Sequence, residues 1–395
     1  MRFMHISDLH IGKRLCETDL SADIEHALFS EILGRIYQEA SAERPVDVLV
    51  ISGDIYDKSL PSAEAEECFG RLLAQAVKLG MKVLVSSGNH DSARRLASNE
   101  ALLSQLGVYI SETFSAEHPV RIVGLGELDA ALMPFVTLSD VRGAYPDDDI
   151  PDMTAALAAV LRHAGLPGDR PCVLAAHQAA GLSGGKLVGT AECADFCVFD
   201  GFLYTFLGHI HTPQNVGERA RYCGSPVCYS GSEAKQPQKY CDIVDISPDG
   251  GLSVQQHEIH PLHGFRTMEG SFVRLMSEEF PPTEDYCYIT VSEIDGVEGV
   301  AAQLRTKFPN MLSLRHIQDT AAGSEQEGSG EEQDFRSDFS SFYRAVSHKD
   351  IDEDILKSAE YIFRLTEEAF AAGTSAELES MKPRLSDGED SENDD

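Results

Sequence analysis

The first 270 residues of the sequence are organised around short apolar runs, each followed within a few residues by a polar cluster. Helical periodicity in residues 23–39 and 62–79 separates the first three runs. Such alternation of strand and helix predicts an α/β domain, and the strand-rich stretch 222–258 predicts that it ends in β-structure. The runs expected to form strands before that stretch are residues 3–6, 46–51, 82–86, 121–123, 172–176 and 203–207.

The polar clusters stand where expected strands end. Because α/β sheets bind ligands at the carboxyl ends of their strands, side chains from distant parts of the sequence are expected to meet there. Asp8 and His10 are two residues apart, as are His209 and His211, so each pair can leave an extended segment on one face. The candidate metal ligands are Asp8, His10, Asp54, Asn89, His177, His209 and His211.

Taken alone, most of these clusters also have a structural interpretation. An aspartate after a glycine, such as Asp54, can cap the next helix, and a lone histidine such as His177 is more often a hydrogen-bonded structural residue. The loop Gly88-Asn89-His90-Asp91 is more specific, because a turn has no structural need for the His-Asp pair. Five clusters in this order, each after its own strand, are not expected by chance and favour a common site.

The donor set also selects the metal. Carboxylate and amide oxygens mixed with imidazoles, without thiolates, favour Mn²⁺, Mg²⁺ or iron over structural Zn²⁺, and Mn²⁺ is the first choice. Seven donors imply two ions, and the two carboxylate oxygens of Asp54 allow it to bridge them. Two cations about 3.5–4 Å apart are the arrangement used for in-line displacement at phosphorus. The sequence therefore predicts a two-metal phosphodiesterase.

The net charge of −33 bears on the substrate. Phosphate binding normally requires a basic surface, so a strongly acidic chain argues against nucleic acid. Much of the negative charge, however, lies in residues 319–334 and 377–395, which are polar and poor in aromatic residues. Nucleic acid therefore remains open as a substrate, bound through metal ions, local basic residues or a partner and sensitive to salt.

The sequence contains no run approaching the roughly 18 apolar residues of a membrane span. Its first residues fit a buried strand better than the apolar core of a signal peptide. We therefore expect a soluble cytoplasmic protein.

Smaller units are expected in the C-terminal third of the chain. Residues 335–371 have two helical patterns, the first with an amphipathic face that includes Phe342 and Tyr343. This face either packs on a core of its own or binds a partner, and the acidic linker before it favours the partner. The expected parts are a phosphoesterase domain (1–269), a small α/β domain (270–318), an acidic linker (319–334), a helical partner-binding segment (335–372) and a disordered acidic tail (373–395).

The five motifs together resemble those of the calcineurin-like metallophosphoesterase superfamily. Further stretches, among them residues 207–214 and 222–226, resemble the SbcD (Mre11-like) nucleases of that superfamily, over about residues 1–372. The resemblance implies an α/β fold built on a two-sheet β-sandwich flanked by helices, with a small α/β capping domain and a C-terminal helical pair. One departure is Gly231, which stands where such sequences lead us to expect an aromatic residue.

The resemblance also implies roles for individual residues. His90 would position the scissile phosphate and protonate the departing ribose oxygen, with Asp57 or Asp91 as its orienting partner. Asp54 would lie between the two metals. One metal would be held by Asp8, His10 and His211, and the other by Asn89, His177 and His209.

Three functions are compatible with these features. The resemblance implies a homodimeric DNA exonuclease and endonuclease that works with an SbcC (Rad50-like) coiled-coil ATPase on DNA ends in repair, recombination and replication. The same ligands would serve a stand-alone phosphatase or small-substrate phosphodiesterase, which would need neither the cap nor the helical segment. A scaffold without catalysis is disfavoured, because every expected ligand is present.

Overall fold

The computed structural model describes residues 1–16, 18–166, 170–181, 193–317 and 356. The chain divides into two units, Met1–Asp319 and Thr320–Asp395. The linker, helical segment and tail predicted for residues 319–395 lie outside the described residues, apart from Leu356.

The first sheet is built around strand β1 (Arg2–Ile6), all five residues of which are buried. β1 pairs in parallel with β4 and antiparallel with β15, so it is a central strand covered on both faces, which explains its apolar character. In spatial order the strands are β16 (Leu252–Ile259), β15 (Lys239–Ile246), β1, β4 (Val48–Ser52), β5 (Lys82–Ser86) and β6 (Val108–Ile110).

The second sheet has the same number of strands and packs face to face on the first. Its three central pairings, which join β8, β9, β12 and β14, are parallel, and both edge strands are antiparallel to their neighbours. In spatial order the strands are β13 (Gln214–Asn215), β14 (Ala220–Tyr222), β12 (Thr205–Gly208), β9 (Cys172–His177), β8 (Asp129–Leu132) and β7 (Arg121–Gly124).

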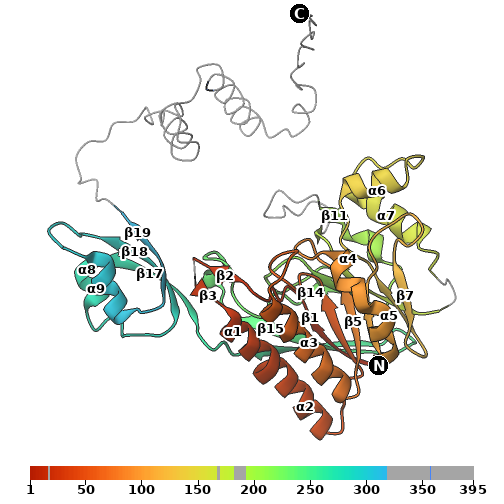
Figure 1. Ribbon diagram of the computed structural model, residues 1–395, viewed down its shortest axis with the longest axis horizontal. Coiled ribbons are helices and arrows are strands. Elements are labelled where there is room, and N and C mark those ends of the chain that lie inside the picture. Colours follow the sequence, from red (N-terminus) through yellow and green to blue (C-terminus); the bar gives the residue numbers. More distant parts are fainter. Residues whose placement is uncertain (17, 167–169, 182–192, 318–355, 357–395) are drawn as a thin grey trace, which may run out of the picture. The chain divides into compact units, whose positions relative to one another are not determined.

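Apolar side chains fill three layers of core. Phe3, Val50 and Phe206 belong to the layer between the sheets. A second layer packs the other face of the first sheet against helices, two of which, α2 and α3, lie side by side (Figure 1). A third packs the second sheet against α6 (Leu138–Ala144) and α7 (Met153–His163). The helices over the first sheet are α1 (Ser21–Glu25), the π-helix His26–Ile32, α2 (Leu33–Ser41) and α3 (Ala63–Lys78).

The sandwich flanked by helices confirms the fold class expected from the sequence. The helix predicted for residues 62–79 is α3, and the side chain of Ser62 caps it by accepting a hydrogen bond from the Ala65 backbone N–H. The strand predicted for residues 82–86 is β5. Short elements complete the body: β2 (Arg14–Leu15), β3 (Thr18–Asp19), α4 (Ala93–Leu96), α5 (Glu100–Leu103), β10 (Ala180–Gly181), β11 (Ala194–Asp195) and the 3₁₀ turns Ala97–Asn99, Ser104–Leu106, Phe196–Phe199 and Glu233–Lys235.

A small unit with its own apolar core follows the sandwich, and we call it the cap. Its three strands are parallel, and its two helices are short. The elements are β17 (Phe265–Ser271), α8 (Phe272–Met276), β18 (Tyr286–Ser292), α9 (Val300–Lys307) and β19 (Met311–His316).

Asp23 in α1 ties the cap to the sandwich. Its buried carboxylate accepts hydrogen bonds from the Tyr286 hydroxyl (2.8 Å) and from the backbone N–H and ring Nδ1 of His263 (3.1 and 3.0 Å). The ring of Tyr288 lies against Gly231, so that a Cβ there would approach the ring to 3.3 Å. The cap's aromatic ring therefore fills the space next to Gly231, which explains the absence of an aromatic residue at that position.

One buried histidine is expected to make stability depend on pH. His5 faces the second sheet, its Nε2 lies 3.1 Å from Ser52 Oγ on the neighbouring strand β4, and burial together with Arg221 lowers its pKa to about 3. The unfolded chain therefore binds a proton below a pH of about 6.5 that the folded chain does not bind until about 3, so stability is lost as pH falls through this window. Between about pH 7.5 and pH 5 this amounts to about 2 kcal/mol.

The measurement is urea unfolding of the chain and of His5→Gln at the two pH values, in a chelator. The variant should lose less stability on acidification than the parent, although it is less stable at the higher pH. Equal losses in the two proteins would contradict the assignment.

Candidate metal centre

The site is built at the carboxyl ends of strands from both sheets. The loop after β1 carries Asp8 and His10, and it runs beside the loop after β4, which carries Asp54. Backbone hydrogen bonds join the two loops, from Asp8 N–H to the Gly53 carbonyl and from His10 N–H to the Asp54 carbonyl, each 3.0 Å long. The backbones of the two loops that carry these side chains are therefore held next to each other.

Four of the seven candidate ligands have a left-handed backbone. The φ angles of Asp8, His10 and Asp54 are 53°, 43° and 49°, and that of His209 is 101°. Non-glycine residues adopt such angles at a cost of order 1–3 kcal/mol each, and they are concentrated at functional sites. The strained φ angles indicate that the loop conformations serve to direct these side chains into the site and do not minimise the energy of the backbone.

Two glycines permit the close packing of the loops. A Cβ on Gly53 would overlap the ring of His177, and the φ of +80° at Gly53 is itself unfavourable for other residues. A Cβ on Gly88 would overlap the carboxylate and backbone N of Asp54. Glycine is therefore required at both positions for the second sheet's histidine and the loop after β5 to reach Asp54.

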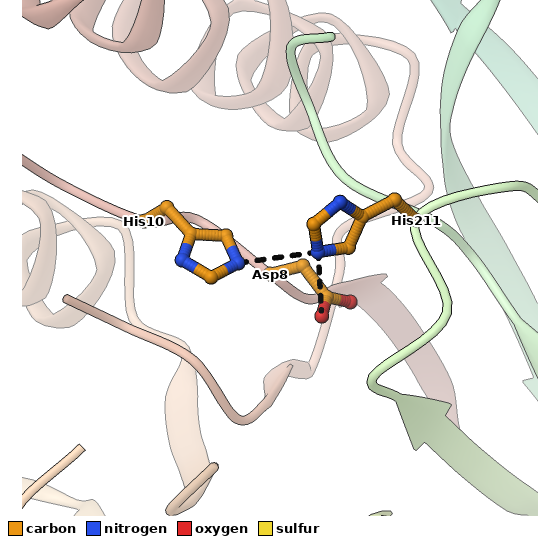
Figure 2. Close-up of side chains that lie close together, drawn as sticks. All are labelled: Asp8, His10 and His211. Atoms are coloured by element: carbon orange, nitrogen blue, oxygen red, sulfur yellow. Dashed lines mark hydrogen bonds and ion pairs between the residues drawn. The ribbon is translucent and has the colours of Figure 1, made fainter. Parts of the chain in front are cut away.

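The first group of candidate ligands contains Asp8, His10 and His211 (Figure 2). His211 Nε2 lies 3.2 Å from His10 Nε2 and 3.7 Å from Asp8 Oδ1, and ligand atoms of all three residues lie within 4.8 Å of one another. Asp8 and His10 are buried, and the Asp8 carboxylate is further held by Ser7 Oγ at 2.5 Å. Two imidazole nitrogens and a carboxylate oxygen thus converge on one small volume.

The second group contains Asn89, His177 and His209. The Asn89 Oδ1 atom lies 3.1 Å from His177 Nε2 and 3.1 Å from His209 Nδ1. The other nitrogen of His177, Nδ1, donates a 2.8 Å hydrogen bond to the Ser52 carbonyl, which directs Nε2 toward the group. This group combines the amide oxygen and the two imidazoles that the family resemblance implies for one ion.

Asp54 lies between the two groups. Its Oδ2 atom is 3.5 Å from His10 Nε2 in the first group and 3.4 Å from His177 Nε2 in the second. Although burial opposes protonation of His177, the ionised Asp54 raises the pKa of His177 to about 9. The carboxylate therefore favours positive charge beside it, as expected of a residue that faces cations.

The residues present fit a divalent metal centre. The donors are carboxylate, amide and imidazole atoms, without thiolates, and the acidic groups Asp8 and Asp54 are almost completely buried. Buried carboxylates require compensating positive charge, because desolvation otherwise disfavours the ionised form. All seven residues named from the sequence are brought together, and their role as ligands remains a prediction.

Comparison with known proteins agrees with this geometry. Residues 1–213, more than half of the chain, match the family described as Calcineurin-like phosphoesterase. The chain belongs to this family. The D subunit of the nuclease SbcCD from Staphylococcus epidermidis (strain ATCC 12228 / FDA PCI 1200) is 26% identical over 332 residues, which make up 80% of this chain and 86% of that protein. Among the described residues of this calcineurin-like phosphoesterase, none of the helices has the length and hydropathy of a membrane span.

His90 stands beside the first group and is held by a backbone atom. Its Nδ1 donates a 2.9 Å hydrogen bond to the Asp57 carbonyl, and its Nε2 makes no hydrogen bond to any of the described residues. The Asp91 carboxylate instead accepts backbone N–H bonds from Gly88, Ile55 and Tyr56. Asp57 is therefore the orienting contact of His90, through its carbonyl rather than its carboxylate, while Asp91 holds the two loops together.

Some residues at the site of this phosphoesterase were not singled out from the sequence. The Tyr229 ring lies 5.0 Å from the His10 ring and 5.5 Å from the His211 ring, and its hydroxyl donates to the Leu9 carbonyl. Phe135 stacks on His209 at 6.3 Å. Glu233 Oε1 lies 3.1 Å from His211 Nδ1. The only signal for Tyr229 and Glu233 was their place in the segment around Gly231, where we expected a different residue.

Chelation of divalent cations is expected to destabilise the protein. A metal that binds the folded chain alone adds stability by mass action, about 4 kcal/mol at 1,000 times its Kd, so Tm should rise by several degrees with Mn²⁺. Thermal unfolding in EDTA and in Mn²⁺ measures the difference. His177→Asn, which removes one donor, should show a smaller Mn²⁺-dependent rise. A rise equal to that of the parent would place the stabilising ion elsewhere.

Proposed function

We propose that this chain is a metal-dependent DNA nuclease, a double-strand exonuclease and single-strand or hairpin endonuclease, acting as the nuclease subunit of an SbcCD-type complex. The observation that carries the chemistry is the position of Asp54 Oδ2, 3.5 Å from His10 and 3.4 Å from His177, between two groups of donors. The step to DNA is supported by the staphylococcal relative, whose aligned 332 residues extend well beyond the 213 of the family match.

The proposed centre would hold two Mn²⁺ ions, for which Mg²⁺ could substitute. Asp8, His10 and His211 would hold one ion, Asn89, His177 and His209 the other, and Asp54 both. Such ions supply Lewis-acid activation of the phosphoryl group and of a nucleophilic water. The chain's own contribution is to hold the donors rigidly, through the strained loops and their mutual hydrogen bonds.

His90 is proposed as the general acid. With Nδ1 bonded to the Asp57 carbonyl, Nε2 is the ring atom available to a substrate. A protonated Nε2 can hydrogen-bond the scissile phosphate and transfer its proton to the departing deoxyribose oxygen, which is a poor leaving group as an alkoxide. His90 lies close to the first group, with its ring centroid 4.8 Å from that of His10.

The proposed organisation assigns a role to each part of the chain. Residues 1–269 form the nuclease domain and residues 270–318 the capping domain. The helical segment 335–372, after the acidic linker 319–334, is proposed to bind an SbcC (Rad50-like) coiled-coil ATPase, with the acidic tail at 373–395. The complex is proposed to be cytoplasmic, to contain two copies of the chain, and to process DNA ends in repair, recombination and replication.

The test is digestion of end-labelled linear and hairpin DNA by the purified full chain with Mn²⁺, with and without an SbcC (Rad50-like) coiled-coil ATPase. The nuclease proposal expects shortened or nicked DNA that disappears when EDTA is added. Intact DNA in all reactions, together with hydrolysis of bis(p-nitrophenyl) phosphate, would overturn the nuclease proposal and favour a small-substrate phosphodiesterase. Cleavage only with the ATPase would support the complex.

A further inference from the structure

Three largely buried polar side chains lie behind His211, and we call Ser225, Glu233 and Lys239 the His211 bracket. Glu233 Oε1 lies 3.1 Å from His211 Nδ1, and Lys239 Nζ donates to Glu233 Oε2 at 2.5 Å. Lys239 Nζ also donates to Ser225 Oγ at 2.8 Å. The bracket therefore contacts the ring nitrogen that points away from Asp8 and His10.

The bracket also holds the backbone of His211. Its carbonyl accepts hydrogen bonds from Lys239 Nζ (3.1 Å) and from the Ser225 backbone N–H (3.2 Å). The Lys239 ammonium group thus donates hydrogen bonds both to the Glu233 carboxylate, which contacts the His211 ring, and to the backbone carbonyl of His211. Both the position and the rotation of the imidazole are fixed by this arrangement.

The desolvation cost of the Glu233–Lys239 ion pair indicates that the bracket has a role other than stabilising the fold. The side chains of Glu233 and Lys239 are 9% and 5% exposed, so both charges have lost almost all of their hydration. Buried ion pairs often stabilise a fold no better than well-packed apolar residues would. Here the pair is aimed at a single imidazole, and a carboxylate on the second nitrogen of a metal-binding histidine is a recurrent way to fix its orientation.

We propose that Glu233 is a positioning residue that accepts the Nδ1 proton of His211 and thereby presents the Nε2 lone pair to the space shared with Asp8 and His10. Lys239 acts through Glu233 by holding its second carboxylate oxygen. The proposal deepens the proposed function and rests on it, because the purpose of the orientation is metal binding at Nε2.

Among the described residues, no other candidate histidine has its Nδ1 within hydrogen-bond distance of a carboxylate. His177 Nδ1 is held by the Ser52 backbone carbonyl, and the buried Nδ1 of His10 lies 3.8 Å from Asp57 Oδ1, too far for a hydrogen bond. His211 is thus oriented by a side chain that a substitution can remove. The 3₁₀ turn that carries Glu233 also contacts β17 of the cap.

The test compares Glu233→Gln and Glu233→Ala with the parent, all as full chains. Isothermal titration with Mn²⁺ should give an affinity about 10–100-fold weaker for the Ala variant, with a smaller loss for Gln, which keeps an acceptor oxygen. Glu39→Gln is the matched control, because it neutralises a different carboxylate, which is buried near the start of β1 and paired with Arg2 and Arg35, and its Mn²⁺ affinity should equal that of the parent. Thermal unfolding in EDTA verifies that every variant is folded.

A second measurement detects the Nδ1 proton of the His211 ring in the absence of metal. Proton–nitrogen NMR spectra of the labelled chain in EDTA should contain a protected Nδ1–H signal of His211, assigned by its loss in His211→Asn. That signal should exchange rapidly in Glu233→Ala. In addition, His211→Asn combined with Glu233→Ala should bind Mn²⁺ no more weakly than His211→Asn alone, because Glu233 acts through His211.

Unchanged Mn²⁺ affinity in Glu233→Ala, or additive losses in the double variant, would overturn the positioning role. An unprotected Nδ1 proton in the parent would overturn it as well. If the parent binds no Mn²⁺, the metal centre of the proposed function fails. A Glu233-dependent Nδ1 signal would in that case support the orientation of the ring separately from the metal.

Discussion

Replacement of Asp54 by Asn is expected to lower phosphodiester hydrolysis by at least about 10³-fold, about 4 kcal/mol of transition-state stabilisation. The amide keeps the size of the carboxylate, so the hydrogen bond from His90 N–H to Oδ1 can be retained. It loses the negative charge that lies between the two donor groups, and it offers only one oxygen to two cations. Initial rates with bis(p-nitrophenyl) phosphate and labelled DNA measure the loss, and Mn²⁺ titration should show weaker binding.

The matched control is Asp129→Asn. Asp129 is also buried and charged, but it lies at the opposite end of the second sheet, where it pairs with Arg170. Its replacement should leave the hydrolysis rate per folded molecule unchanged. A rate for Asp54→Asn within tenfold of the parent would contradict the bridging role, even if both variants fold normally.

Replacement of His90 by Asn is expected to lower DNA cleavage by about 10²–10⁴-fold, the contribution typical of a general acid. Bis(p-nitrophenyl) phosphate has a leaving group that departs without protonation. The variant should therefore hydrolyse this substrate much closer to the parental rate, and Mn²⁺ affinity should be unchanged because His90 is not a proposed ligand. The asparagine amide can keep the hydrogen bond to the Asp57 carbonyl, so the loop remains in place.

The comparison of the two substrates is the decisive measurement for His90. Equal losses on DNA and on the activated substrate would assign His90 to phosphate positioning alone. Undiminished DNA cleavage would remove it from the reaction. His118→Asn, at an exposed histidine, controls for the loss of an imidazole as such.

Much of the fold could be predicted because the apolar runs are buried on both faces. The strand expected at 172–176 is β9, which ends at His177 itself, and the strand expected at 46–51 begins two residues later because its pairing with β1 starts at Val48. β8 was missed, since Asp-Ala-Ala-Leu has no β-branched residue and forms a strand only through its neighbours β7 and β9.

The candidate site could be predicted where two ligand-type residues lie close together in the sequence. Two such pairs are Asp8 with His10 and His209 with His211. The two-residue spacing at the end of a strand places both side chains of a pair on the same face. Glu233 could not be found in this way, because it lies on a 3₁₀ turn 22 residues after His211, with strands β13 and β14 between them. The orienting atom of His90 is a backbone carbonyl, which no residue type encodes.

The contact between Gly231 and Tyr288 has a consequence for building chimaeras from related proteins. Gly231 and the Tyr288 ring that packs against it come from different parts of the chain. An exchange of the cap alone therefore replaces one of the two contacting residues and disrupts their packing. A graft that brings a smaller residue at position 288 leaves a void, and one that brings an aromatic residue to position 231 produces a steric clash. Positions 231 and 288 should therefore be exchanged together in a chimaera.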